Sequence, residues 1–187
     1  LMAEYGQERR QLVPIEDIPE VMIDAVLATE DARFYEHSGI DYIGVARAAL
    51  ANLDRQKSQG ASTITMQVAR NTYLSKQKTY TRKIYEMLLT LKLEHLLSKS
   101  QILEVYMNQI FLGHRAYGFA SAAHTYFGKD LQDVNLAEAA MLAGIPKSPS
   151  TSNPITNLKR AKARQHHVLD RMVENQFISA AQAEQAK

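Results

Sequence analysis

A helical repeat of apolar residues, divided by helix-capping residues, runs through the sequence from Ile18 to its end. Apolar side chains recur three and four positions apart, which is the period of an amphipathic helix. Only the first fourteen residues show the pattern of an extended segment. Of the 187 residues, 45% are hydrophobic and only 8 are glycine and 5 proline, so the chain can bury a substantial core. We therefore predict a mostly α-helical fold.

Capping residues set the predicted helix ends, because their side chains bind the backbone amides of a first helical turn. The predicted starts, each at or beside such a residue, are Asp17, Asp41, Ser62 or Thr63, Thr79, Ser98, Asn135, Asn153 with Pro154, and Ser179. The helix that begins near Asp17 is expected over 18–34, and the longest is expected to end near Leu97. Gly113, Gly128 and Gly144 mark predicted helix ends.

The two ends of the sequence predict that it was cut from a longer chain. The first residues carry no start signal, and the capped helix from Ser179 stops eight residues later. No apolar run approaches the roughly 20 residues of a membrane-spanning helix. The absence of cysteine excludes disulfides and thiolate metal sites but leaves the redox compartment open.

Charge is unevenly distributed along a chain whose net charge is only +2. Residues 1–41 carry 10 acidic and 3 basic side chains, and residues 42–100 carry 10 basic and 3 acidic ones. Lys76, Lys78, Arg82 and Lys83 crowd a predicted helix N-terminus, where the helix dipole favours negative charge. A bound phosphate or pyrophosphate would make this cluster favourable. The alternative is a basic helix end in solvent.

Glu86 is the first of two candidate functional carboxylates. It lies one turn after Arg82, on the face opposite Ile84, Leu88 and Leu91. From Met87 onward this helix is apolar nearly all round, so we predict that it is central and buried. A carboxylate at the mouth of such a core could bind a divalent metal or orient a cation. The alternative is a simple helix pair between Arg82 and Glu86.

Glu30 is the second candidate. It shares a helix face with Ile23, Val26, Leu27 and, if the helix continues, Phe34. An apolar setting disfavours the charged form of a carboxylate, which suits it to general acid or base chemistry near neutral pH. The alternative is a surface or capping carboxylate.

The stretch "GASTITMQVARN", from Gly60 to Asn71, offers a second group of anion-binding residues. Ser62 and Thr63 stand at a predicted helix N-terminus, where backbone amides and hydroxyls can hold phosphate oxygens. Gln67 and Arg70 follow one and two turns later. The alternative is an ordinary N-capped core helix.

Several segments together resemble the peptidoglycan glycosyltransferase domain of class A penicillin-binding proteins, glycosyltransferase family 51. The five motifs, in order, are similar to "EDARFYEHSGID", "GASTITMQVARN", "RKIYE", "ILEVYMNQIFLG" and "AAHTYFGK", followed by "LAEAAMLAGIPKSPS". The resemblance covers nearly the whole chain from Ile18. It implies one glycosyltransferase domain, with a lysozyme-like helical large lobe, about 15–41 and 60–187, and a smaller mobile jaw lobe, about 42–59.

The resemblance also assigns roles to residues of this chain. It implies that Glu30 is the general base and Glu86 the second essential carboxylate, and that a divalent metal, Mg²⁺ or Mn²⁺, takes part, with Glu86 as a candidate ligand. The residues expected to bind substrate or its pyrophosphate are Asp31, Ser62, Thr63, Gln67, Arg70, Lys78, Arg82, Lys83 and Asn108. Two positions depart from the usual family pattern: Met66 replaces a glutamine, and Lys78 replaces an arginine, which loses bidentate phosphate geometry.

The implied activity is polymerisation of lipid II into β-1,4-linked glycan by inverting transfer, with release of undecaprenyl pyrophosphate. The implied partners are lipid II, the lipid-linked glycan, the bacterial membrane surface and a transpeptidase domain, at the periplasmic face of the cytoplasmic membrane. The alternatives are a lysozyme-like glycan-cleaving enzyme and an inactive scaffold for cell-wall partners. A nucleic-acid-binding module is disfavoured, because the basic middle offers only Tyr73, Tyr80 and Tyr85 for base stacking.

Overall fold

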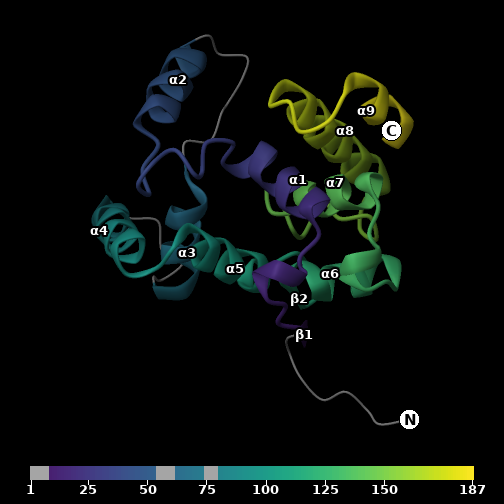
Figure 1. Ribbon diagram of the computed structural model, residues 1–187, viewed down its shortest axis with the longest axis horizontal. Helices are drawn as coiled ribbons and strands as arrows, with labels where there is room; N and C mark the ends of the chain where they lie inside the picture. The colour runs from purple at the N-terminus through teal and green to yellow at the C-terminus, as the bar shows by residue number, and fades with distance from the viewer. Residues whose placement is uncertain (1–8, 54–61, 74–79) are drawn as a thin grey trace. The chain divides into compact units, whose positions relative to one another are not determined.

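The computed structural model describes residues 9–53, 62–73 and 80–187. This part of the chain is mostly helical (Figure 1), which confirms the predicted fold class. The α-helices are α1 (Glu20–Glu30), α2 (Tyr42–Leu53), α3 (Ile64–Tyr73), α4 (Tyr80–Leu96), α5 (Lys99–Gln109), α6 (Phe119–Phe127), α7 (Leu136–Gly144), α8 (Leu158–Glu174) and α9 (Ala180–Ala186). Two short 3-10 helices are η1 (Ile15–Asp17) and η2 (Leu131–Asp133), and strand β1 (Arg9–Arg10) pairs in parallel with β2 (Ala116–Tyr117).

The chain divides into two compact units. The first consists of Leu1–Thr29 and Met107–Lys187, and the second of Glu30–Tyr106. The predicted jaw lobe, about 42–59, falls inside the second unit together with α3 and α4. Because 54–59 lie outside the described residues, the boundaries of that lobe stay a prediction.

Small residues allow the close packing of α7 against α8 in the first unit. Ala139, Ala140 and Ala143 are buried, and a Cβ added at Gly144 would approach the Cβ of Arg164 on α8 to 3.1 Å. The apolar face of α8, which the helical period predicts, is buried in return. This packing forms the core of the first unit.

A side-chain clasp holds the segment that leads into α1. The side-chain amide of Asn108 donates to the carbonyl of Val13, and its oxygen accepts from the backbone N–H of Val13, each at 2.8 Å. Both residues are buried. Farther along, Arg171 of α8 donates to the backbone carbonyl of Ala28, 3.3 Å away. Segments distant in sequence therefore position both ends of α1.

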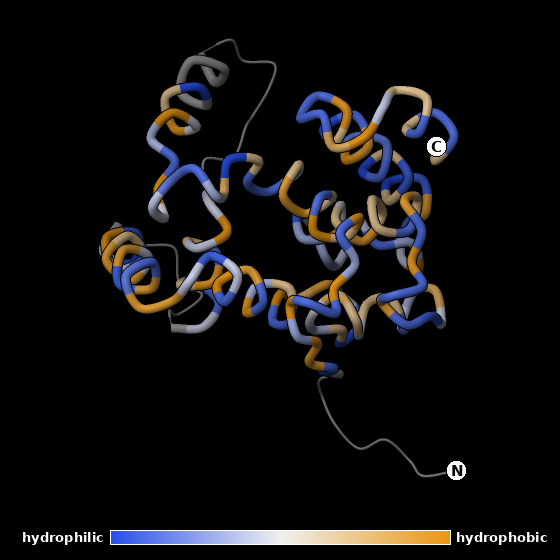
Figure 2. The backbone as a smooth tube through the Cα atoms, in the orientation of Figure 1, coloured by the Kyte–Doolittle hydropathy of each residue, from blue (hydrophilic) through white to orange (hydrophobic). Residues whose placement is uncertain are grey.

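In the second unit, α3 packs against α4. The surroundings of α4 differ from those that the sequence predicted. Leu93 is buried as expected, but Ile84, Leu88 and Leu91 are 60%, 58% and 47% exposed. Apolar and polar residues alternate along this helix (Figure 2), and many of its large apolar side chains are exposed. The prediction of a central, buried helix from Met87 onward is therefore wrong.

Several predicted caps are confirmed by side-chain hydrogen bonds. The Asp41 carboxylate accepts from the amide of Gly44 at 2.8 Å and begins α2, and Thr63 accepts from Met66 at 3.2 Å and begins α3. The reciprocal bonds of a capping box are present at the starts of α5, α7 and α9. Although burial acts to raise it, the hydrogen bonds from Arg33 and Gly44 hold the pKa of Asp41 below its usual range.

Two predicted helix starts and one predicted end are wrong. Asp17 belongs to η1 instead of capping α1, and α1 ends at Glu30 instead of continuing to Phe34. Asn153 uses its side chain within a turn, accepting from the amide of Thr156 at 2.8 Å, so α8 begins only at its own cap, Asn157. At the end of α1 and at the start of α8, a polar side chain close to the expected boundary, Asp31 or Asn153, accepts from another backbone amide.

Candidate active site

Glu30 is the last residue of α1 and is half-buried. Its Oε2 accepts a hydrogen bond from the side-chain amide of Gln67, which lies on α3, at 2.9 Å. The amide donor stabilises the ionised carboxylate and fixes its orientation. The structure therefore brings together two residues that the sequence placed in the site from separate motifs.

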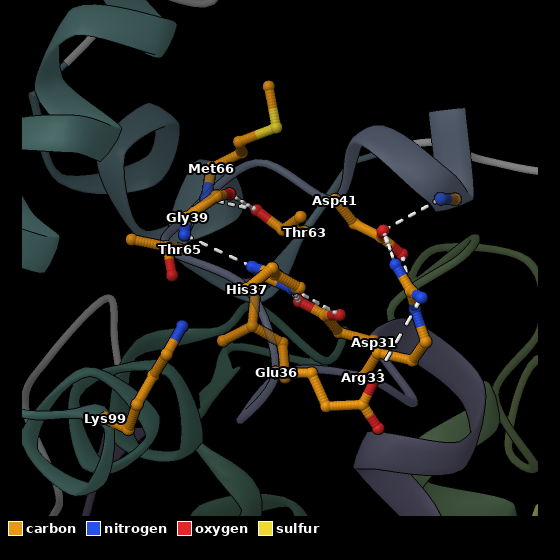
Figure 3. A network of polar contacts seen from close by, with 12 residues as sticks. Asp31, Arg33, Glu36, His37, Gly39, Asp41, Thr63, Thr65, Met66 and Lys99 are labelled. Atoms are coloured by element: carbon orange, nitrogen blue, oxygen red, sulfur yellow. Dashed lines mark hydrogen bonds and ion pairs between the residues drawn. The ribbon is translucent and has the colours of Figure 1, made fainter. Parts of the chain in front are cut away.

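Asp31 is buried and joins the first motif to the start of α3 (Figure 3). Its carboxylate accepts from the backbone amide of Ile64 at 3.0 Å and lies 2.9 and 3.1 Å from Nε2 of His37. Nδ1 of His37 accepts from the amide of Gly39 at 3.2 Å, so Nε2 carries the proton shared with Asp31. These bonds turn the chain away from the helical path directly after Glu30 and explain why α1 ends there.

Thr63 is used within the protein. Its hydroxyl donates to the carbonyl of Gly39 at 2.6 Å and accepts from the amide of Met66, and the residue is only 2% exposed. With the amide of Ile64 bound to Asp31, protein groups already occupy part of the N-terminus of α3. This arrangement favours an N-capped core helix at Thr63. Ser62, just before it, is half-buried, and its phosphate-binding role stays a prediction.

Glu86 is completely buried on the face of α4 opposite the exposed Ile84 and Leu88. Its Oε2 accepts from Arg82 at 3.0 Å and its Oε1 from Lys83 at 2.6 Å. The Lys83 side chain is 43% exposed, whereas that of Arg82 is 16% exposed. Burial of a carboxylate is costly unless cations and hydrogen bonds compensate it, and here two cations do so. The cluster carries a net positive charge that reaches the surface at Lys83.

The described residues do not fit a protein-bound divalent metal at Glu86. Both carboxylate oxygens already accept from cationic side chains. Among residues 9–53, 62–73 and 80–187, no three His, Cys, Asp or Glu side chains gather closely enough to hold a metal ion. A divalent cation prefers several carboxylate or carbonyl oxygens. The predicted metal stays a prediction that no contact of Glu86 supports.

Arg70 and Glu30 influence the same buried phenol. Tyr106, on α5, is fully buried, and its hydroxyl has no hydrogen-bond partner within the described part of the chain. Burial, followed by the charges of Glu30 and Asp31, raises the pKa of Tyr106 well above its usual value, and Arg70 opposes this. Tyr106 was not among the predicted site residues, although it is a tyrosine within the fourth motif, on a helix face that is otherwise apolar.

Lys78 and Asn108 are the two predicted binding residues that are not among the described residues of the second unit. Lys78 lies outside the described residues. Asn108 belongs to the first unit, where its side-chain amide is bound to Val13. The remaining predicted residues belong to the second unit: Glu30, Asp31, Ser62, Thr63, Gln67, Arg70, Arg82, Lys83 and Glu86.

Comparison with known proteins identifies the class. A family model described as Transglycosylase matches residues 1–173. Penicillin-binding protein 1A of Neisseria lactamica is 57% identical over 183 residues, which cover 97% of this chain and 23% of that protein. A relative from Cupriavidus necator, whose name places it among the transglycosylases, is 62% identical over 167 residues, covering 89% of this chain and 72% of the relative.

A solved structure agrees with these relatives. The crystal structure of penicillin-binding protein 1A from Haemophilus influenzae matches with a TM-score of 0.62 and 33% identity, over 99% of this chain and 18% of that chain. The chain therefore belongs to the transglycosylase family and is a glycosyltransferase by class. It spans 23% of the length of the Neisseria relative. The resemblance based on the five motifs is confirmed, and the glycan-cleaving and scaffold alternatives are not favoured.

Proposed function

We propose that this chain polymerises lipid II into β-1,4-linked glycan strands by inverting glycosyl transfer, with release of undecaprenyl pyrophosphate. The observation that carries the proposal is the half-buried carboxylate of Glu30, oriented by Gln67, in the same unit as the buried cluster of Glu86, Arg82 and Lys83. A base and a group of cations are the two requirements for attack of a hydroxyl on a sugar that leaves a pyrophosphate.

Glu30 is the proposed general base. It takes the proton of the 4-hydroxyl on the incoming lipid II sugar while that oxygen attacks the anomeric carbon of the lipid-linked glycan. The new bond forms on the face opposite the pyrophosphate, whose bond to the anomeric carbon breaks. The Gln67 amide, 2.9 Å from Oε2, keeps the carboxylate oriented for this transfer. Such base assistance contributes roughly 10²- to 10⁴-fold to rate.

Arg82, Lys83 and Arg70 are the proposed stabilisers of charge on the leaving pyrophosphate. Glu86 fixes the guanidinium of Arg82 and the ammonium of Lys83 before substrate binds. Cations that are already oriented stabilise developing charge without reorganising during the reaction. Lys78 is proposed for the same role from its motif. No step of this mechanism uses a metal ion, because the described residues do not supply its ligands.

The proposed place of action is the periplasmic face of the cytoplasmic membrane, beside a transpeptidase domain of the full-length protein. Within the described residues, no helix has the length and apolar character to cross a bilayer. Exposed apolar side chains do occur on α2, at Tyr42 and Ile43, and along α4, at Ile84 and Leu88. Apolar side chains on helices that also carry basic residues suit contact with a lipid surface.

The test is polymerisation of lipid II in detergent by the wild-type chain and by Glu30→Gln. The substitution keeps the shape of the side chain and removes its basicity, so we expect turnover to fall by roughly 10²-fold or more. Glu16→Gln, at an exposed acidic residue of η1, is the matched control and should polymerise at the wild-type rate. Wild-type turnover by Glu30→Gln, or release of fragments from lipid-free glycan, would contradict the proposal.

A further inference from the structure

Glu94, in the last turns of α4, connects three helices of the second unit. Its Oε1 accepts from the hydroxyl of Thr65 on α3 at 2.5 Å and from the ammonium of Lys99 on α5 at 2.8 Å. The Glu94 side chain is 10% exposed and that of Lys99 is 21% exposed. Figure 3 shows the ammonium end of Lys99 directed toward Thr65, in agreement with their shared acceptor.

Each partner has a physical reason to stay with Glu94. Thr65 is completely buried, so its hydroxyl would lose a partner in a place that water does not easily reach. Lys99 is the first residue of α5, where the helix dipole disfavours a cation. Two contacts offset this cost: the ion pair with Glu94 and the ring of Phe34, whose centroid lies 4.4 Å from Nζ.

The same part of α4 also contacts Gly39, in the loop of the first motif that follows α1. Gly39 has φ +89°, and a Cβ added there would lie 2.7 Å from Cγ2 of Thr90 and 2.9 Å from Cγ of Glu94. The carbonyl of Gly39 in turn accepts from Thr63, the cap of α3. Glu94 thus contacts α3 through Thr65 and supports the loop that holds the α3 cap.

These contacts matter because α3 and α4 carry different parts of the candidate site. Gln67 and Arg70 lie on α3, one of them bound to Glu30, whereas Arg82, Lys83 and Glu86 lie on α4. We infer that Glu94 is a positioning residue: with Thr65 and Lys99 it fixes α3 relative to α4, and thereby the Gln67-bound base relative to the cations. This inference rests on the proposed function.

The test measures kcat and KM for lipid II polymerisation by variants of the three residues. Thr65→Val removes the hydroxyl at nearly constant shape. Because a displacement of about 1 Å at a reacting centre costs about 10²-fold in rate, we expect kcat and kcat/KM to fall together by about 10- to 100-fold. Thr65→Ser, which keeps the hydroxyl that Thr65→Val removes, should retain most of the wild-type activity.

Lys99→Met should also lower kcat, because it removes the ammonium and keeps the apolar stem. Its matched control is Lys92→Met, at an exposed lysine of the same unit, which should leave kcat unchanged. If Thr65→Val does not fold, Glu94→Gln replaces it, since it keeps an acceptor for Thr65 while removing the ion pair with Lys99. Its kcat should fall as for Lys99→Met.

The outcomes separate this inference from the proposed function. A wild-type kcat in Thr65→Val, or in both Lys99→Met and Glu94→Gln, would overturn the positioning role even if thermal stability falls. A purely structural role predicts that result, because below its melting temperature a folded variant would retain its turnover. Absence of polymer from the wild-type chain, or full activity in Glu30→Gln, would instead refute the proposed function.

Discussion

Asn108→Leu tests whether the fourth-motif asparagine is a structural clasp or a substrate ligand. The sequence assigns it to substrate binding, whereas its side-chain amide donates to and accepts from the backbone of Val13 at 2.8 Å. Leucine has a similar volume and can make neither bond. The substitution would leave the N–H and the carbonyl of Val13 without these partners, at a residue that is only 7% exposed.

The expected loss of stability follows from those two backbone groups. A buried donor or acceptor without a partner costs about 1–3 kcal/mol. Partial access of water at the segment's exposed neighbours lowers the sum, so we expect a loss of about 2–4 kcal/mol in the free energy of unfolding. At about 2–4 °C per kcal/mol for a chain of this size, the melting temperature should fall by about 4–16 °C.

Thermal and urea unfolding followed by circular dichroism give the stability, and lipid II polymerisation gives KM. Asn108→Asp refines the test, because its carboxylate can accept from the Val13 amide but cannot donate to the Val13 carbonyl. We expect it to lose at least half as much stability as the leucine variant. Asn71→Leu, at an exposed position near the end of α3, is the control and should unfold like the wild type.

A raised KM with unchanged unfolding would refute the clasp and support substrate binding. Unchanged values of both would show that neither role is correct. A large loss of stability with a KM close to wild type, measured well below the melting temperature, is the result that the contacts with Val13 predict.

Two further predictions concern a close backbone approach and a buried phenol. Gly39→Ala should lower the melting temperature, because it places a Cβ 2.7 Å from Thr90 at φ +89°; an unchanged melting curve would refute the close contact. Burial raises the pKa of Tyr126, which donates to the carbonyl of Leu112 at 2.6 Å, to about 12. The neutral Tyr126 phenol should contribute fully to stability below the usual phenol pKa of about 10, and this contribution should be lost as pH rises toward 12. In urea titrations, the free energy of unfolding of Tyr126→Phe should therefore lack this alkaline decline.

The sequence correctly predicted contacts between residues that are close along the chain. Asp41, Ser98 with Gln101, and Asn135 with Glu138 cap the helices they were predicted to cap. A cap bonds to an amide two or three residues along the chain, so its partner is known from the sequence. The pairing of Arg82 with Glu86, one helical turn apart, is predictable for the same reason.

Errors arose where a polar side chain had a partner far along the chain. Asp31 binds the amide of Ile64, which ends α1 at Glu30 instead of near Phe34. The contact of Asn108 with Val13, 95 residues away, was likewise not predicted, and the substrate-binding role of Asn108 stays a prediction. The apolar pattern of α4 likewise predicted burial, because periodicity indicates which side chains share a face but not whether another element covers it.

The sequence by itself determined the helical class, most helix starts, the family and both candidate carboxylates, since these follow from residue order, local hydrogen bonding and motif spacing. Only the tertiary structure decided which group orients Glu30 and how α3 is fixed to α4. Gln67 at Glu30, and Thr65 with Lys99 at Glu94, are 37, 29 and 5 residues apart from their partners. The two longer pairings form only when packing offsets the entropy lost in closing the loop between the paired residues.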